Sequence, residues 1–185
     1  ILLSLAILVA SVAGNRLWHH YKNQQAQQAA DLYAVLQQQV DRGGGAAKIR
    51  DAALLLTEGF ASSGYASRAA VISAQASVKA GDTPAAKTML QWVLDQSEEV
   101  ELKDLARLRL AGILLDEQQF EQALSLLNTK HGFSFTGLYA DLRGDVLVAS
   151  GNVKEARAAY QQALDHLGRQ SSYQNIVQMK MDALR

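Results

Sequence analysis

The chain has 185 residues, with 18 basic and 18 acidic side chains and therefore no formal net charge. This balance disfavours a nucleic-acid-binding protein, because such domains carry a basic excess that matches the phosphate backbone. The absence of cysteine excludes a disulfide framework, a thiolate zinc site and a cysteine nucleophile. Apolar residues make up 49% and proline occurs once, a composition that predicts a helical domain with a substantial core.

The first predicted element is the apolar segment ILLSLAILVASVAG, residues 1–14. It carries no charge and is apolar on every side, which favours lipid over the one-sided face of a core helix. It would span only about 21 Å of a hydrocarbon core of about 30 Å. We therefore interpret residues 1–16 as a transmembrane helix whose N-terminal part precedes this chain. A signal peptide ending near Ser11-Val12-Ala13 and a buried core helix are the alternatives.

The predicted membrane anchor combines this head with the aromatic residues that follow it. Trp18 and Tyr21 lie among cations and histidines, a mixture found at the membrane–water boundary. Adjacent helical residues point about 100° apart, so we place His19 and His20 at this boundary instead of on a shared metal ion. The anchor residues are Leu2, Leu5, Val9, Val12, Trp18 and Tyr21.

Residues 17–64 are predicted to form a long juxtamembrane helix and a first helical hairpin. Apolar residues recur at spacings of three and four in the long helix, which is expected to continue directly from the membrane segment. Gly43-Gly44-Gly45 ends it without the Gly-Lys-Ser/Thr of a phosphate loop. The apolar stripes are Ala29, Leu32, Tyr33, Leu36 and Val40, and then Ile49, Ala53, Leu56 and Phe60 on a helix over about 46–62.

Residues 65–170 contain three similar helix pairs, over about 65–97, 101–129 and 137–167. Ala86, Ala123 and Ala156 occupy matching places in the second helices, 37 and then 33 residues apart. This period is close to the roughly 34 residues of a tetratricopeptide repeat (TPR). Gly81-Asp82 and Gly151-Asn152 are typical turns between helices. The corresponding Glu117-Gln118-Gln119 lacks a glycine.

The three helix pairs resemble TPR motifs in the residues at their closest approaches. Small residues occupy the expected place in the first helices, and Phe120, Tyr160 and Ala163 match later aromatic and small positions; the small residues are Ala74, Ala111 and Gly144. Residues 171–185 are predicted to be a capping helix, with Ile176, Met179 and Leu184 directed inward. The expected fold is all-α: an N-terminal transmembrane helix that continues into a TPR-like solenoid of helical hairpins with a C-terminal cap.

On the TPR register, the first helices line an inner groove. The places of the TPR clamp for C-terminal carboxylates hold other residues here, so that function is not implied. The groove is apolar at one end and acidic at the other, which predicts capture of an apolar partner segment or an unfolded client. Alternatively, the chain's own residues 17–40 or 172–185 fill it. The candidate groove residues are Arg68, Val71, Gln75, Leu105, Leu108, Leu115, Leu138, Asp141, Asp145 and Val148.

The sequence predicts no catalytic residues, no metal ligand set and no cofactor, and we expect a non-enzymatic protein. Glu98, Glu99 and Glu101 are the densest carboxylate cluster. They lie at a helix junction, where carboxylates are expected to stabilise the N-terminus of the following helix.

Over its whole length, the chain resembles the ancillary subunit of the bacterial Sec translocon (YfgM-like). The resemblance rests on the apolar head with RLWHHYK (16–22), on ADLRGDVLVASGNVKEARAAYQQAL (140–164) and on QMKMDALR (178–185). It implies a single-pass inner-membrane protein with a cytoplasmic N-terminus and a periplasmic repeat domain. It also implies association with the SecY/E/G channel and pairing with a membrane-anchored periplasmic folding factor of the peptidyl-prolyl isomerase type (PpiD-like).

The expected function is to hold a periplasmic chaperone or an emerging, unfolded secretory client near the channel exit. Confinement of this kind raises effective concentration without tight intrinsic affinity. The lipid bilayer is an expected partner and nucleic acid is not. The alternative is a membrane-anchored TPR scaffold for folded envelope-assembly proteins, without activity towards unfolded clients; a cytoplasmic adaptor is a variant in topology.

Overall fold

The computed structural model describes residues 2–168 and 172–184, including the side chains of residues 12–168 and 172–184. Every regular element within these ranges is helical, which confirms the all-α prediction. The elements are α1 (Leu2–Asp41), α2 (Ala46–Gly59), α3 (Gly64–Lys79), α4 (Thr83–Gln96), α5 (Val100–Asp116), α6 (Phe120–Leu127), the short 3-10 helix η1 (Phe133–Phe135), α7 (Thr136–Ala149), α8 (Val153–His166) and α9 (Ser172–Asp182).

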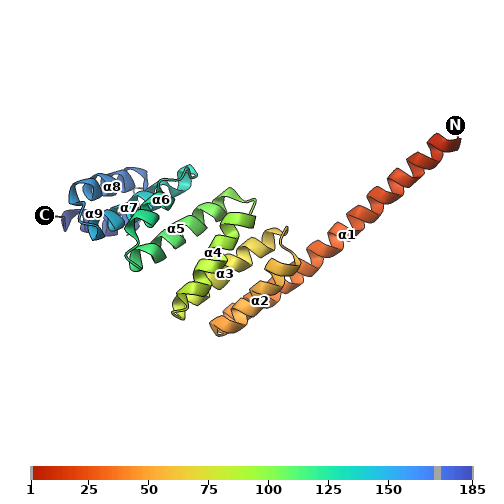
Figure 1. Ribbon diagram of the computed structural model, residues 1–185, viewed down its shortest axis with the longest axis horizontal. Coiled ribbons are helices and arrows are strands. Elements are labelled where there is room, and N and C mark those ends of the chain that lie inside the picture. Colours follow the sequence, from red (N-terminus) through yellow and green to blue (C-terminus); the bar gives the residue numbers. More distant parts are fainter. Residues whose placement is uncertain (1, 169–171, 185) are drawn as a thin grey trace.

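Consecutive helices pack as antiparallel hairpins, α1 with α2, α3 with α4, α5 with α6 and α7 with α8, and α9 packs on α8. Figure 1 shows an elongated body with α9 at one end and the N-terminal part of α1 projecting from the other. The first helices α3, α5 and α7 also contact one another in sequence. They therefore form one face of the stack, as the TPR register predicts.

Helix α1 runs without interruption for 40 residues, so the apolar head and the juxtamembrane segment form one rod about 60 Å long. Its C-terminal half packs on α2 and α3 and buries Ala29 and Leu36 completely. Val40, predicted to lie on the same stripe, is instead 41% exposed near the turn. Among the residues described, none of the helices combines the length and the apolar character needed to cross a membrane.

The same turn closes each hairpin. In every case a residue with positive φ follows the first helix, and the next residue's N–H bonds to a carbonyl five positions earlier, as in a Schellman cap. Three of the positive-φ residues are glycines, but the turn from α5 to α6 uses Gln118 at φ 61°. The sequence signal for this turn is weak because the segment lacks a glycine, yet the turn has the same geometry as the others. The three glycines are Gly43, Gly81 and Gly151.

Small residues let the two helices of a hairpin approach closely. Ala86, Ala123 and Ala156 are fully buried, which confirms the role predicted for them. Gly144 is the extreme case, because a Cβ atom there would lie 2.4 Å from the ring of Tyr160. The hairpin of α7 and α8 therefore depends on the pairing of a glycine with a large ring.

Two buried groups tie the loop after α6 to the body. The Asp104 carboxylate is buried and accepts hydrogen bonds from the Gly132 N–H at 2.8 Å and from Arg107 at 2.7 Å. The Tyr139 hydroxyl donates to the Asp104 carbonyl at 2.7 Å, and burial, followed by the charge of Asp104, raises the pKa of Tyr139 to about 12. These bonds fix where α7 begins.

Glu99 has a different role from the one predicted for its carboxylate cluster. It stands at the start of α5, but its side chain makes no capping hydrogen bond. Both carboxylate oxygens instead accept from the Arg68 guanidinium, at 2.6 and 2.7 Å. The pair joins α3 to α5, and its exposure limits its contribution to roughly 1 kcal/mol or less.

Candidate partner-binding site

The inner face of the stack ends at α7, where the acidic residues are covered by α9. Lys180 of α9 donates to Asp141 at 3.0 Å and to Asp145 at 2.7 Å. The hydroxyl of Tyr173, also on α9, donates to the Asp141 carboxylate, and the hydroxyl of Tyr160 on α8 donates to Asp145 at 2.7 Å. Asp141 is 2% exposed, so its charge is compensated almost entirely within the chain.

The surroundings of this cluster raise the pKa values of Tyr160, Tyr173 and Lys180. Burial raises the pKa of Tyr160, and its hydrogen bond to Asp145 raises it further. Burial and the bond to Asp141 do the same to the pKa of Tyr173. Burial alone would lower the pKa of Lys180, but its bonds to Asp145 and Asp141 raise it above its ordinary value. The folded chain therefore holds these protons tightly, as a structural lock for the cap requires.

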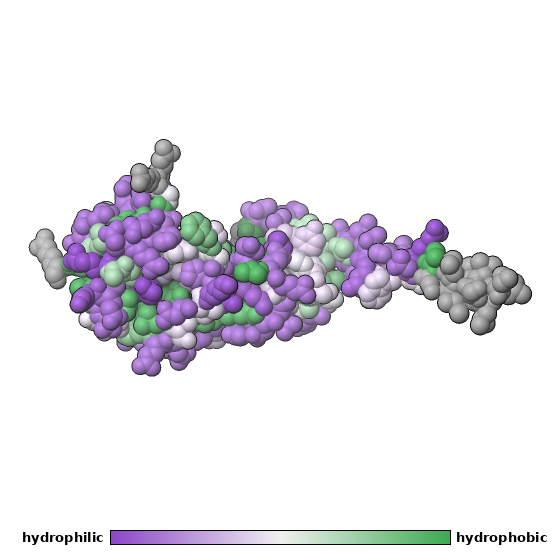
Figure 2. Space-filling model, turned by 90° about the horizontal axis from the view of Figure 1, so that it is seen from above, coloured by the Kyte–Doolittle hydropathy of each residue, from purple (hydrophilic) through white to green (hydrophobic). Residues whose placement is uncertain are grey.

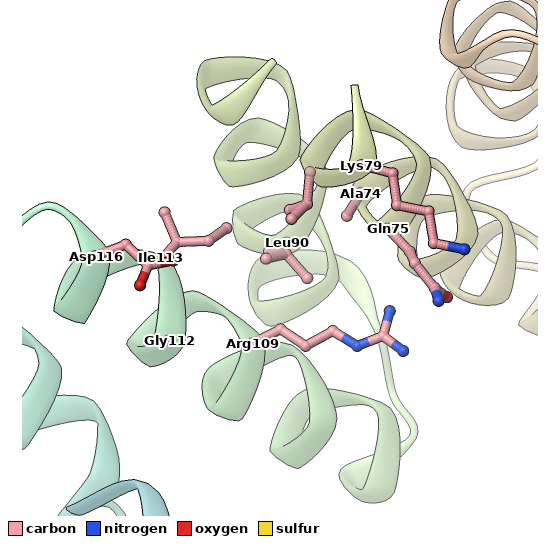
Figure 3. Close-up of a pocket in the computed structure, with 9 residues that line it drawn as sticks. Ala74, Gln75, Lys79, Leu90, Arg109, Gly112, Ile113 and Asp116 are labelled. Atoms are coloured by element: carbon pink, nitrogen blue, oxygen red, sulfur yellow. The ribbon is translucent and has the colours of Figure 1, made fainter. Parts of the chain in front are cut away.

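The centre of the same face is open. A cavity of about 410 Å³ lies between α3, α4 and α5, with an apolar floor formed by Ala74, Leu90 and Ile113 (Figure 3). Gly112 borders it, and a Cβ atom at this residue would have no neighbour within 4 Å. The volume is within the range of binding pockets, and the apolar floor suits a hydrophobic side chain.

Charged and polar side chains border this floor. Figure 3 shows Gln75, Lys79 and Arg109 extending to the same side of the cavity, with Asp116 at the opposite end. The Arg109 guanidinium donates to the Val71 carbonyl at 3.2 Å, and burial lowers its pKa. None of the described carboxylates forms an ion pair with Arg109.

A second hollow, of about 810 Å³, lies on the other side of the stack between α4, α5 and α6. It is larger, but two polar groups on its rim are already engaged: Lys87 pairs with Glu117 at 2.8 Å, and Gln91 donates to Asp95 at 2.9 Å. Trp92 covers part of it and packs against the core. We therefore take the inner cavity as the candidate site, because its apolar floor is bordered by Arg109, a cation without an ion-pair partner among the described residues.

Figure 2 shows the distribution of hydrophobic residues on one face of the molecule. Hydrophilic residues dominate the face it shows, and hydrophobic side chains emerge between them over the body without forming one broad apolar sheet.

The structure separates the predicted groove residues into three groups. Gln75 lines the cavity, whereas Val71 is buried and Arg68 is paired with Glu99. Asp141 and Asp145 bind α9, so the chain's own C-terminal helix fills the acidic end, as one of the two alternatives stated. The remaining residues do not line the cavity: Leu105, Leu108, Leu115 and Leu138 are half-buried, and Val148 is 38% exposed.

Of the residues that α5 contributes to the cavity, the sequence predicted Gly112 but missed Arg109, Ile113 and Asp116. The TPR register selected Leu105, Leu108 and Leu115, but these leucines pack against the central core. The face that borders the cavity is rotated by one residue and carries Arg109 and Asp116. Leucines lie on several sides of α5, so apolar periodicity could not choose a face. The spacing of three and four residues from Arg109 through Gly112 to Asp116 was the available signal.

The inward face of α9 was also predicted one residue away from the observed one. Ile176 and Met179 are 46% and 68% exposed, whereas Val177 is fully buried. Leu184, the third predicted position, is buried at 8%. The helix is oriented by Tyr173 and Lys180, which must reach the acidic residues of α7, and Val177 shares their face.

The membrane anchor is only partly described. Leu2, Leu5 and Val9 are helical in backbone, but their side chains lie outside the described part of the structure. Val12, Trp18 and Tyr21 are 48%, 57% and 54% exposed. The Trp18 and Tyr21 rings are 6.4 Å apart, and the Lys22 amine lies 5.0 Å from the centre of the Trp18 ring. The aromatic residues and the cation therefore form one cluster on the projecting rod.

Comparison with known proteins agrees with this architecture. A family described as a tetratricopeptide repeat-like domain matches residues 1–185. The chain is 28% identical to the ancillary SecYEG translocon subunit of Neisseria gonorrhoeae, over 97% of this chain and 88% of that protein. The proteins of the same name from Haemophilus influenzae and Escherichia coli are 29% and 28% identical, over 88% and 83% of this chain and 79% and 73% of their own lengths. No solved structure gave a significant match.

The family and its relatives are repeat proteins and translocon subunits, not enzymes, which confirms the prediction of a non-enzymatic chain. The match extends over the projecting rod, the four hairpins and the cap. The chain therefore belongs to the tetratricopeptide-repeat-like family of the ancillary SecYEG translocon subunits.

Proposed function

We propose that this protein is an accessory subunit of the Sec translocon that holds a folding factor or an emerging secretory segment beside the channel. The observation that carries the proposal is the match of relatives named as SecYEG ancillary subunits along nearly the whole chain. The inner cavity supports it, because a half-open apolar hollow suits transient binding of protein segments. Tethering at the channel raises the effective concentration of such segments, so weak contacts suffice.

The proposed location is the bacterial inner membrane, with residues 1–16 as the membrane-embedded part and the hairpins in the periplasm. Leu2, Leu5, Val9 and Val12 would face lipid, and the cluster of Trp18 and Tyr21 would lie at headgroup level. The rod supports this arrangement, because α1 continues unbroken from the apolar head into the first hairpin. The repeat domain would thus be held at a fixed distance from the bilayer.

The proposed partners are the SecY/E/G channel, a PpiD-like membrane-anchored folding factor and unfolded secretory clients. A photo-crosslinking amino acid at position 112 places the probe in the cavity, and the same probe at Lys154, an exposed residue of α8, is the control. We expect crosslinks to the channel, the folding factor or a client from position 112 and none from position 154. Equal crosslinking from both positions, or none from position 112, would contradict the proposal.

A scaffold for folded envelope proteins is distinguished by adding an unfolded client. If the proposal holds, the purified chain in nanodiscs lowers aggregation of a chemically unfolded secretory protein, and a Gly112→Phe substitution that fills the cavity removes this effect. Retained binding of folded partners without protection of unfolded ones would favour the scaffold. A single cysteine at Lys154, probed with a membrane-impermeant thiol reagent in intact spheroplasts, tests the compartment, because the chain has no other cysteine.

A further inference from the structure

The inner cavity has a charge pattern that an apolar ligand alone does not explain. Arg109 is half-buried at its border, and one of its five guanidinium N–H donors bonds to the Val71 carbonyl. Its charge has no carboxylate partner among the described residues. A partly desolvated cation of this kind favours an anion that brings its own carboxylate.

The other end of the cavity carries the opposite charge. Figure 3 shows the Arg109, Lys79 and Gln75 side chains directed to one side of the apolar floor and Asp116 at the other. Within the described residues, neither Lys79 nor Asp116 takes part in an ion pair. The site is therefore polarised along its length, cationic at one end and anionic at the other.

The equivalent site in the next hairpin shows what such a face can bind. Counted back from the positive-φ turn residue, Gly112 corresponds to Asp145, six residues before the turn in both α5 and α7. Lys180 of α9 donates to Asp145, and Val177, three residues before Lys180 on the same face of α9, is fully buried. The acidic residues of α7 thus receive a complementary cation from α9, and Val177 of α9 joins the apolar cluster of Ala140 and Leu147, whereas a cavity remains beside Gly112 of α5.

We propose that the inner cavity binds an internal segment of a partner chain in which a large apolar side chain has an Asp or Glu on one side and a Lys or Arg on the other. The apolar group fills the space beside Gly112, the carboxylate binds Arg109, and the partner's cation lies against Asp116. An internal segment fits better than a chain end, because a C-terminal carboxylate would leave Asp116 without a counterpart. This inference rests on the proposed function and specifies the segments that the protein holds.

The test uses synthetic peptides and the full chain in lipid nanodiscs. The probe is a fluorescent nine-residue peptide, acetylated and amidated so that its ends carry no charge, with a central Phe, Glu on one side and Lys on the other. Its counterparts replace Glu by Gln, or Phe by Ser. Fluorescence anisotropy should show that the Glu peptide binds about tenfold more tightly than the Gln peptide, as expected for a charge-assisted, partly buried pair.

Substitutions then assign this preference to named residues. Arg109→Gln should abolish the preference for Glu over Gln, whereas Lys154→Gln, at an exposed cation of α8, should retain it. Arg109→Glu should bind a peptide in which Glu is replaced by Lys better than the original, and this charge swap distinguishes a contact from loss of fold. Gly112→Phe should weaken the binding of all the peptides, because the phenylalanine ring fills the space for their apolar side chain.

Equal binding of the Glu and Gln peptides, or a preference that survives Arg109→Gln, would overturn the inference. So would a peptide with a free C-terminal carboxylate that binds without its Glu. If position 112 still crosslinks to translocon partners in that case, the proposed function stands and only the chemistry of the segment is wrong. If the charge preference holds but no translocon partner crosslinks, the cavity is a peptide site and the proposed function fails.

Discussion

The central hairpin of α5 and α6 and the C-terminal hairpin of α7 and α8 have equivalent positions on the inner face. In α7 these positions are covered by the chain's own cap, whereas in α5 one of them borders an open cavity. Ten and six residues before the turn, α7 carries Asp141 and Asp145, and both are bound by Lys180 of the chain's own cap. At the same places α5 carries Leu108 and Gly112, and a cavity remains beside the glycine. One backbone arrangement therefore supports both a self-filled and an open surface, and the side chains decide between them.

The difference between these two hairpins indicates where a partner can bind. The acidic end, which the sequence suggests as half of a binding groove, is part of the packed structure, because its charges are neutralised within the chain. The central cavity has an apolar floor and a charged border, and none of the described segments of the chain fills it. Binding experiments should therefore target α3 and α5, and stability experiments should target α7 and α9.

Lys180→Ala is the strongest way to break the closed end. It leaves the buried Asp141 and the half-buried Asp145 without their cation, and removal of one member of a buried pair costs about 3 kcal/mol. Urea unfolding should show this loss, and hydrogen exchange should show it concentrated in α7 to α9. Lys154→Ala, at an exposed lysine of α8, is the matched control and should change stability little. A loss spread equally over all the hairpins would mean that the cap is not a local lock.

Gly144 and Gly112 test the same contrast with one added methyl group. Gly144→Ala should destabilise the chain by about 2 kcal/mol, because its Cβ atom would lie 2.4 Å from the Tyr160 ring. Gly112→Ala should stabilise it by roughly 1 kcal/mol, because its Cβ atom enters open space and alanine favours the helix. Both values come from chemical unfolding. Effects of the same sign would show that the two faces are not packed differently.

Alkaline pH should destabilise the region of α7 to α9 before it destabilises the central hairpins. The raised pKa values of Tyr160 and Tyr173 mean that the unfolded chain loses these protons first, above the ordinary value of 10.0. The raised pKa of Lys180 acts in the same direction. The contribution of these groups to the free energy of unfolding is therefore present in full below pH 10, and at pH 11 it should have fallen by about 1.4 kcal/mol for each tyrosine. Thermal melting against pH checks this, and the double variant Tyr160→Phe, Tyr173→Phe should show a shallower dependence.

Gln118→Gly is the mildest change and acts at the hairpin that borders the cavity. Gln118 adopts φ 61°, a conformation that glycine adopts at less steric cost. Relief of this strain, reduced by the greater entropy of glycine in the unfolded chain, should stabilise the protein by about 0.7 kcal/mol in urea unfolding. Gly81→Ala, at the equivalent turn with φ 77°, should have the opposite effect. A destabilising Gln118→Gly would mean that the glutamine side chain contributes more than its backbone costs.

Local signals in the sequence determined the helices and their turns. Gly81 and Gly151 marked turns that the structure retains, and the alanines at a period of 37 and 33 residues marked the close approaches. These features are readable because a turn or a tight contact restricts the residue type at a single position. The hairpin of α1 and α2 has the same turn at Gly43, but its large buried residue, Leu36, stands in the first helix where the other pairs have a small one. That hairpin was therefore predicted without being seen as a repeat.

What faces inward was decided only by the tertiary structure. On α5 the apolar residues surround the helix, so the side that borders the cavity depends on how α3 and α4 pack against it. On α9 the buried face follows Lys180 and Tyr173, whose partners lie 32 to 39 residues earlier in α7. Helical periodicity is a property of neighbouring residues, whereas the rotation of a helix about its axis is fixed by contacts between distant ones. The sequence by itself therefore determined the elements and their order, and the packing decided which face is closed and which is open.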